Sequence, residues 1–206
     1  MSVIKIYSDA PDEQLLDQLS QKLRQGSLMI LPSGTGYCYA CDALNQKAVD
    51  RLVKLKGYGK SKRPLALMCE DISMAAQFCR INNEAFRFIK DREGGRYTFI
   101  LPALGQLPKT IKDRKEIGLR LAIHPVSKHL IHLLEDPLMV ASINTSEDLN
   151  VEDLSNPELI AEYEETKHHD MRADVLIDSG EIARIPSEVI DCTSDEYLII
   201  REGGDR

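Results

Sequence analysis

The stretch SLMILPSGTGYCYACD, residues 27–42, indicates how this chain folds. Residues 27–32 form a short apolar run bounded by turn residues, which is typical of a buried strand. A polar turn follows at 33–36, where two glycines alternate with Ser33 and Thr35, and a second strand-like pattern comes after it. The sequence therefore predicts a small hydroxyl-rich turn at the exit of a buried strand.

Helix and strand patterns alternate on both sides of this stretch. Apolar residues at helical spacing predict a first helix that begins at Pro11 with Asp9 as its cap, and further helices at 46–55, 72–80, 83–91, from 125 onward, and at 156–166. Further strands are predicted at 4–7, 64–69, 97–101, 118–123, 137–142, 173–177, 188–192 and 197–201. We therefore expect one α/β domain over residues 1–206, with a mixed parallel and antiparallel sheet flanked by helices.

The composition excludes some classes of function. The 206 residues carry a net charge of -7 and include no tryptophan, which disfavours binding nucleic acid over the whole surface and stacking bases on aromatic side chains. A local basic patch is not excluded. Five cysteines, an odd number, indicate reduced thiols, and no apolar run approaches the ~20 residues of a membrane span. We expect a soluble cytoplasmic protein that does not bind membranes.

A basic stretch interrupts this acidic chain. LKGYGKSKRPL, residues 55–65, contains Lys56, Lys60, Lys62 and Arg63 within eight residues, with glycines between them. Such a loop can bend around a polyphosphate, although it is not a Walker loop, because the order is wrong and a strand follows it. The alternative is a solvated loop after a helix, with lysines near the negative end of the helix dipole.

Other candidate residues lie at the ends of strands. Ser142 and Asn144 leave one predicted strand and Ser187 begins another, so their side chains can bind phosphate or carboxylate oxygens or can simply cap turns. Arg120 lies inside an apolar strand, where it needs either a buried acidic partner or an anionic ligand. Arg201 ends the last strand, within reach of a phosphate or of solvent.

Two further motifs favour no site. Cys38 and Cys41 form a C-x-x-C pair, but positions three apart on a strand face opposite sides, and no second pair has zinc-ligand spacing. His168 and His169 lie beside acidic residues in a predicted loop, where solvent exposure is the simpler interpretation. We therefore predict no metal site formed by the protein itself.

Seven segments, taken in order, resemble the motifs of the YrdC family, and most of all its YciO branch. They are LPSGTGYCYACD, LVKLKGY before PLALM, GGRYTFIL, IGLRLAIHP, SIN, IPSEVID and REGG. Each motif alone is weak, but the resemblance covers residues 15–204 and keeps the family's order. It implies a twisted mixed sheet with a broad basic concave face.

The resemblance also implies an activity. Synthases of this family join L-threonine, bicarbonate and ATP into threonylcarbamoyl-adenylate, which supplies the threonylcarbamoyl modification of adenosine in tRNA. When the family's site residues are carried over to the matching motifs, the resemblance implies that Ser33, Arg120 and Ser187 bind the threonine moiety. The same carry-over expects catalytic roles for Lys56, Ser142 and Asn144, and a nucleotide site, with Mg²⁺ accompanying ATP, at Lys56, Lys62, Arg63, Ser142, Asn144 and Arg201.

One departure from the family pattern leaves alternatives open. The family's Lys-x-Arg is here Lys56-Gly57-Tyr58, and a tyrosine cannot offer a phosphate the fixed positive fork of an arginine. Arg63 or Lys60 are the candidates to replace it. The alternatives to a synthase are a YrdC-fold protein that binds double-stranded RNA, tRNA or ribosomal RNA, and a regulator that binds a nucleotide or its acyl-adenylate.

Overall fold

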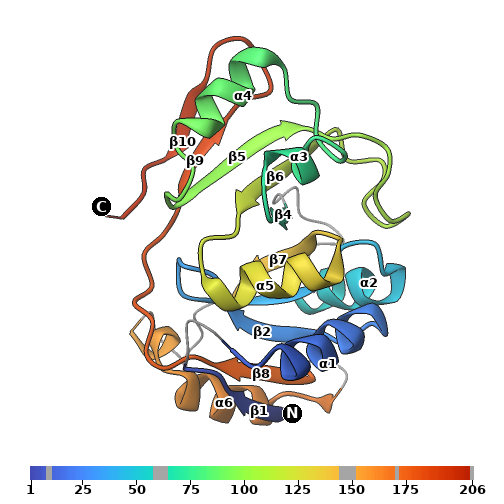
Figure 1. Ribbon diagram of the computed structural model, residues 1–206, viewed down its shortest axis with the longest axis vertical. Coiled ribbons are helices and arrows are strands. Elements are labelled where there is room, and N and C mark those ends of the chain that lie inside the picture. The colour runs from blue at the N-terminus through green and yellow to red at the C-terminus, as the bar shows by residue number, and fades with distance from the viewer. Residues whose placement is uncertain (8–10, 58–64, 144–151, 170–171, 205–206) are drawn as a thin grey trace.

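A single twisted sheet organises the molecule (Figure 1). The computed structural model describes residues 1–7, 11–57, 65–143, 152–169 and 172–204. In this part of the chain, the sheet has ten strands in the order β1-β8-β2-β3-β7-β4-β6-β5-β9-β10, with parallel and antiparallel pairs. The predicted α/β fold with a mixed sheet is therefore confirmed.

The strands and helices alternate along the chain much as the patterns predict. The strands are β1 (Ser2–Lys5), β2 (Met29–Pro32), β3 (Tyr37–Asp42), β4 (Ala66–Cys69), β5 (Tyr97–Pro102), β6 (Glu116–Leu121), β7 (Leu138–Ser142), β8 (Val175–Asp178), β9 (Glu188–Asp191) and β10 (Leu198–Arg201). The helices are α1 (Glu13–Arg24), α2 (Gln46–Leu55), α3 (Ile72–Ala75), α4 (Asn83–Lys90), α5 (Pro125–Leu134) and α6 (Pro157–Thr166), with a short 3-10 turn at Asp153–Ser155.

β3 is buried on both faces and separates two hydrophobic cores. Tyr37, Tyr39 and Cys41 belong to one cluster, while Cys38 and Ala40 belong to the other. This alternation follows from the two-residue period of a strand. It also confirms that the C-x-x-C cysteines point to opposite sides.

Helices cover each face of the sheet. Apolar side chains of α2, α3, α4 and α6 contribute to the core that contains Tyr39, and those of α1 and α5 to the core that contains Cys38. Figure 1 shows α1 and α5 side by side in front of the sheet. None of the described helices is both long and apolar enough to cross a bilayer.

Several boundaries differ from the prediction by a few residues, and three of them have a clear tertiary or capping reason. The first helix begins at Glu13, because the Asp12 carboxylate accepts the Gln14 N–H at 2.8 Å; Asp9 lies outside the described residues. α3 ends at Ala75, because the chain then pairs with the end of β5 through a Cys79–Ala103 bridge. The first strand begins at Ser2, where it pairs with β8.

Candidate functional site

The turn between β2 and β3 forms the centre of the candidate site. Ser33 is only 3% exposed, and its hydroxyl donates to the Gly36 carbonyl at 2.8 Å and lies 3.1 Å from the Thr35 hydroxyl. Gly34 and Gly36 have φ values of 73° and 105°, which glycine adopts without strain. The predicted hydroxyl-rich turn is therefore a tight turn with its hydroxyls packed inward.

Arg120 reaches this turn from β6. Its guanidinium donates to the Thr35 hydroxyl, and the Ile123 side chain beyond β6 packs directly against Gly34. The twist accumulated between β2 and β6 brings the ends of these strands together. Burial lowers the pKa of Arg120, and the positive charge of Arg201 lowers it further. No Asp or Glu in the described ranges forms an ion pair with Arg120, so the hypothesis of a buried structural ion pair has no support there.

Ser187, which directly precedes β9, meets Arg201 at the end of the neighbouring strand β10. Ser187 is 6% exposed, and its hydroxyl lies 2.8 Å from that of Thr98 on β5. The Arg201 guanidinium donates to the Ser187 carbonyl at 2.7 Å and to its hydroxyl at 3.1 Å. Arg201 is therefore held beside a pair of hydroxyls, facing the charge of Arg120.

Two more arginines complete the group, and the sequence reasoning missed both. Arg96 donates from Nε to the Gly34 carbonyl at 2.9 Å. Arg184 lies against the other end of the turn, because a Cβ added at Gly36 would come within 3.4 Å of the Arg184 Cα. Burial and the charge of Arg201 lower the pKa of Arg184. We call Arg96, Arg120, Arg184 and Arg201 the arginine cluster.

The only sequence feature that could have identified these two arginines is that each lies close to a motif of the family. Arg96 stands inside the segment GGRYTFIL, and Arg184 comes shortly before Pro186 and Ser187. Neither arginine lies within an apolar strand as Arg120 does, so the local sequence does not distinguish these side chains from ordinary surface arginines. Only the packing of β5 and of the 182–187 segment against the β2–β3 turn brings them together.

Lys56 and Ser142 form a separate contact. Lys56 caps the end of α2, and its ammonium donates to the Ser142 carbonyl at 2.6 Å. Ser142 pairs with Cys38 in the ladder between β3 and β7, so it lies close to the β2–β3 turn. The Cys38 thiol contacts Ser33, and burial raises its pKa to about 11. The predicted residues Asn144, Lys62 and Arg63 lie outside the described residues.

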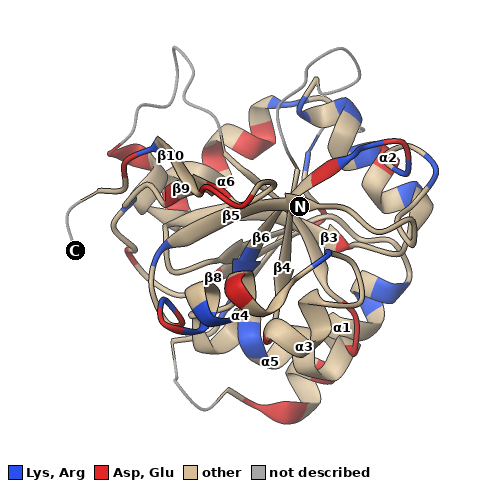
Figure 2. Cartoon of the chain, turned by 90° about the horizontal axis from the view of Figure 1, so that it is seen from above, with Lys and Arg blue, Asp and Glu red and all other residues tan. Residues whose placement is uncertain are grey.

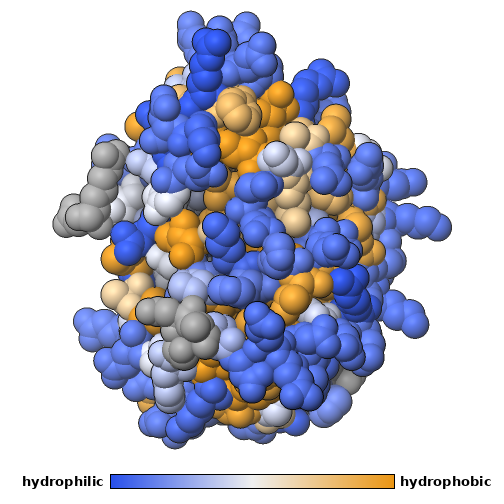
Figure 3. All heavy atoms as spheres, viewed as in Figure 1, coloured by the Kyte–Doolittle hydropathy of each residue, from blue (hydrophilic) through white to orange (hydrophobic). Residues whose placement is uncertain are grey.

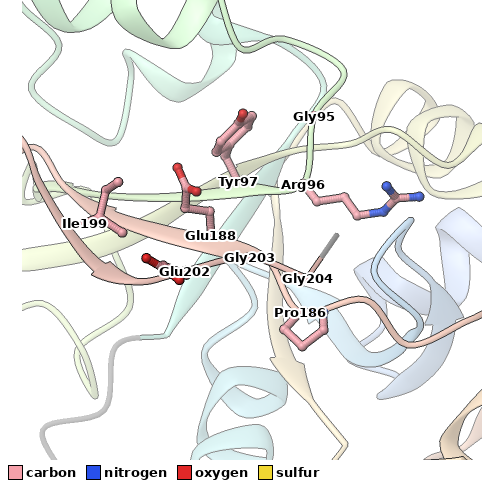
Figure 4. A pocket seen from close by; sticks show the side chains of 9 residues that line it. All are labelled: Gly95, Arg96, Tyr97, Pro186, Glu188, Ile199, Glu202, Gly203 and Gly204. Carbon is pink, nitrogen blue, oxygen red and sulfur yellow. The ribbon is translucent and has the colours of Figure 1, made fainter. Parts of the chain in front are cut away.

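A cavity of about 460 Å³ lies beside the arginine cluster (Figure 4). It is lined by Gly95, Arg96, Tyr97, Pro186, Glu188, Ile199, Glu202, Gly203 and Gly204. Figure 4 shows Arg96 extending away from the Glu188 carboxylate. This cavity shares only Arg96 with the cluster, so the structure places the predicted residues in adjacent groups around the turn rather than in this cavity.

The arrangement is suited to binding anions. The arginine cluster has no acidic partner in the described part of the chain, and two of its members, Arg120 and Arg184, are half-buried. By contrast, Arg51 forms a close ion pair with Asp174 at 2.6 Å. Guanidinium groups pair bidentately with phosphates and carboxylates, and the hydrogen-bonded pair of Thr98 and Ser187 hydroxyls leaves one hydrogen as a neutral donor.

Comparisons with known proteins identify relatives of this chain. Escherichia coli YciO, named an uncharacterized protein, is 29% identical over 200 residues, which cover 96% of this chain and 93% of the relative. Its crystal structure matches with a TM-score of 0.85 and 30% identity, over 100% of this chain and 98% of that chain. Human threonylcarbamoyl-AMP synthase is 27% identical over 88% of this chain and 64% of its own length.

A more distant solved structure shares the fold. Pyrococcus abyssi Sua5, solved as a complex with L-threonine, matches with a TM-score of 0.82 and 24% identity, over 98% of this chain and 58% of that chain. A family model of the Sua5, YciO and YrdC type, described as Telomere recombination, matches residues 21–203. The chain therefore belongs to the Sua5/YciO/YrdC family, with proteins named YciO among its near relatives.

Proposed function

We propose that this protein is a threonylcarbamoyl-adenylate synthase-like nucleotidyltransferase that uses L-threonine, bicarbonate and ATP and supplies the modification of tRNA. The observation that carries the proposal is the arginine cluster around the β2–β3 turn, which lacks acidic partners within the described ranges. Four positive charges held this close together favour a ligand with several negative charges. The human relative supports this choice of reaction, because it carries the name of such a synthase.

In this proposal the two substrates bind next to each other at the turn, because Ser187 and Arg201 are in direct contact. Ser33, Arg120 and Ser187 bind the threonine moiety, and Lys56, Ser142, Asn144 and Arg201 bind the nucleotide together with Lys62 and Arg63. The catalytic contribution of Lys56, Ser142 and Asn144 is to position the phosphates. Arg96 and Arg184 add charge at the same place, since both pack against the turn that carries Ser33.

The chemistry requires positioned cations rather than a protein nucleophile. The amine of L-threonine first combines with bicarbonate to give threonine carbamate and water. An oxygen of this carbamate group then attacks the α-phosphorus of ATP, a new O–P bond forms, and the bond between the α-phosphorus and the oxygen that bridges to the β-phosphate breaks to release pyrophosphate. Both reactants are anions, and the charge that develops spreads over the phosphate oxygens. Arginines fixed before the substrates arrive stabilise that charge without reorganisation.

Mg²⁺ would bind at this site to the phosphates of ATP rather than to protein side chains. Within the described residues, no group of three or more His, Cys, Asp or Glu side chains could hold a metal ion. Mg²⁺ commonly binds substrate phosphates and keeps several waters, so a site rich in arginines and hydroxyls is compatible with an ion that enters with ATP. When bound, it would neutralise phosphate charge.

The direct test is pyrophosphate release from ATP, Mg²⁺ and bicarbonate with and without L-threonine. We expect threonine-dependent release, which Arg120→Gln should reduce by about 10²-fold, the order expected for losing one preorganised donor. Arg87→Gln is the matched control, because Arg87 is exposed on α4. Absence of threonine-dependent release by the unaltered protein would refute the proposal, and salt-sensitive binding of structured RNA by such a protein would favour the RNA-binding alternative.

A further inference from the structure

β10 forms one end of the sheet, and no strand in the described part of the chain pairs with its outer edge (Figure 1). Leu198, Ile199 and Ile200 follow one another on this strand, and they are 60%, 59% and 58% exposed. Single exposed apolar residues are ordinary on protein surfaces, but three in succession on an open edge strand form a surface on which another strand can pair. The proposed synthase site does not explain this exposed edge.

The two faces of the sheet differ in chemistry at this end. The Arg201 guanidinium contacts the Ser187 hydroxyl on the face that carries the arginine cluster. Successive residues of an extended chain point to opposite faces, so Glu188 and Glu202, which directly follow these two residues, point to the other face. A bulge between Ile199 and Arg201 shifts the alternation by one residue, so Ile199 lines the same cavity of about 460 Å³ as the two carboxylates.

The charge around this edge is negative. Neither Glu188 nor Glu202 forms an ion pair or a side-chain hydrogen bond with a residue that the structure describes. Figure 4 shows both carboxylates in the cavity, with Arg96 extending away from Glu188. Asp195 and Glu196, which lie shortly before β10, are exposed as well. Acidic side chains therefore lie at both ends of the apolar edge.

This distribution of charge disfavours a second copy of the chain as the partner. If two β10 strands paired antiparallel about a two-fold axis, Asp195 and Glu196 of one copy would lie near Glu202 of the other. Like charges that face each other across a strand pair are destabilising. A strand with basic side chains makes the same interaction attractive, so the charge favours a basic partner.

We propose that the outer edge of β10 and the adjoining cavity bind an extended basic peptide segment of a partner protein, which adds to the sheet as a further strand. Its basic side chains lie beside Glu188 and Glu202, and its alternate apolar side chains lie beside Leu198 on the opposite face. In strand addition, main-chain hydrogen bonds supply affinity and pockets for alternate side chains supply specificity. The cavity falls within the ~300–1,000 Å³ typical of binding pockets, so a long basic side chain has room to enter.

The test measures peptide binding by fluorescence anisotropy, without ATP or L-threonine, so its result does not depend on synthase activity. The probe is a labelled peptide of four Lys-Val repeats, and we expect it to bind saturably. The same peptide with every backbone amide N-methylated keeps its charge but cannot donate main-chain hydrogen bonds, so it should bind at least about tenfold more weakly. A peptide of Glu-Val repeats should not bind.

Variants of the protein test the acidic face. Glu188→Gln/Glu202→Gln should weaken binding about tenfold or more, because it removes both carboxylates from the cavity. Glu158→Gln/Glu162→Gln is the matched control, since it makes the same change of charge at exposed positions of α6, which packs near β8 toward the other end of the sheet. This control separates a specific site from general attraction between a basic peptide and an acidic protein.

Three results would overturn the proposal: no binding of the Lys-Val peptide, equal binding of its N-methylated form, or equal weakening by the two double variants. Sedimentation of the protein alone tests the second copy as occupant. We expect Ile200→Lys, a change at the exposed edge, to leave the oligomeric state unaltered. A dimer that this substitution dissociates would assign the edge to self-association and would also overturn the proposal.

Discussion

At the scale of single residues, the arginines of this protein fall into two kinds. Arg51 is paired with Asp174, and the same carboxylate accepts the Leu28 N–H at 2.8 Å, so this arginine fixes the chain. Arg120 contacts only a neutral hydroxyl among the described residues, and Arg201 stands near enough to repel it. A half-buried guanidinium without an acidic partner lowers the stability of the fold, and it leaves a positive charge that an anionic ligand can bind.

This contrast predicts opposite effects of two substitutions on stability. Arg120→Met removes a repelled, half-buried charge, so the free energy of unfolding should stay the same or rise by about 1 kcal/mol. Arg51→Met removes two of the hydrogen bonds that the Asp174 carboxylate accepts, so stability should fall by about 1–3 kcal/mol. Urea unfolding followed by circular dichroism measures both. A loss of stability in Arg120→Met as large as in Arg51→Met would show that Arg120 is structural.

Tyr58 allows a second test at this scale, although it lies outside the described residues. The family motif that this chain resembles has an arginine at the corresponding place, which binds phosphate with a fixed positive fork. Tyr58→Arg should therefore increase threonine-dependent pyrophosphate release. Phe86→Arg, at an exposed position on α4, controls for a general effect of added charge. Unchanged turnover in Tyr58→Arg would mean that this position does not limit the reaction.

At the scale of elements, the β2–β3 turn connects the fold to the site. Its two glycines adopt positive φ, and the turn hydrogen bonds hold Ser33 and Thr35 where Arg120 and Arg96 can reach them. Arg120 comes from β6, four strands away from β2 in the sheet order. A change in the turn should therefore affect both stability and the position of the arginines.

Gly34→Ala tests this link. A Cβ at Gly34 would lie 2.2 Å from the Ile123 side chain, and the φ of 73° is itself unfavourable for alanine. We expect a loss of about 2–3 kcal/mol in unfolding free energy together with weaker binding of L-threonine, because the turn holds Ser33 and Arg120 in place. Gly57→Ala is the control, because its φ of 64° imposes the same backbone strain but nothing lies within 4 Å. Equal losses in the two variants would show that the packing against Ile123 is unimportant.

At the scale of the whole molecule, the charged and apolar residues are segregated by burial. Figure 3 shows a face that is hydrophilic over most of its area, with apolar patches separated by polar side chains. All five cysteines are buried and unpaired. Burial raises the pKa of each thiol, to about 11 for Cys38 and about 12 for Cys79 and Cys192, from an ordinary value of 9.0.

These shifts predict alkaline destabilisation. The unfolded chain loses thiol protons near pH 9.0, whereas the folded chain keeps them until about pH 11 or 12. Stability from this source is therefore complete below pH 9 and is lost as the pH rises from 9 toward 11. The urea midpoint of the unaltered protein should fall over this range. In a Cys79→Ser variant, the fall relative to the midpoint of that variant at pH 7 should be smaller. A constant midpoint from pH 7 to 10 in the unaltered protein would contradict the account.

The sequence determined the elements and several of the residues that matter. The periodicity of 46–55 predicts α2 with the bounds that the structure has, and the apolar run at 27–32 predicts β2, because both patterns depend on side chains close in the chain. The position of Arg120 within an apolar strand could also be recognised from neighbouring residues in the sequence. The predicted start of the first helix and the predicted end of α3 were wrong, since the Asp12 cap and the bridge to Ala103 decide them.

Only the tertiary structure decided which of these residues meet. The order of strands in the sheet and its twist bring the start of β5, β6, β9, β10 and the segment after β8 to the β2–β3 turn. Arg96, which precedes β5, and Arg184, which follows β8, come with them, although no local pattern distinguishes either residue. The same is true of Glu164, whose burial depends on α6 packing over Tyr39. Which strands become neighbours depends on how both faces of the sheet are buried. Burial of both faces requires the helices and strands of the whole chain, so no single segment determines it.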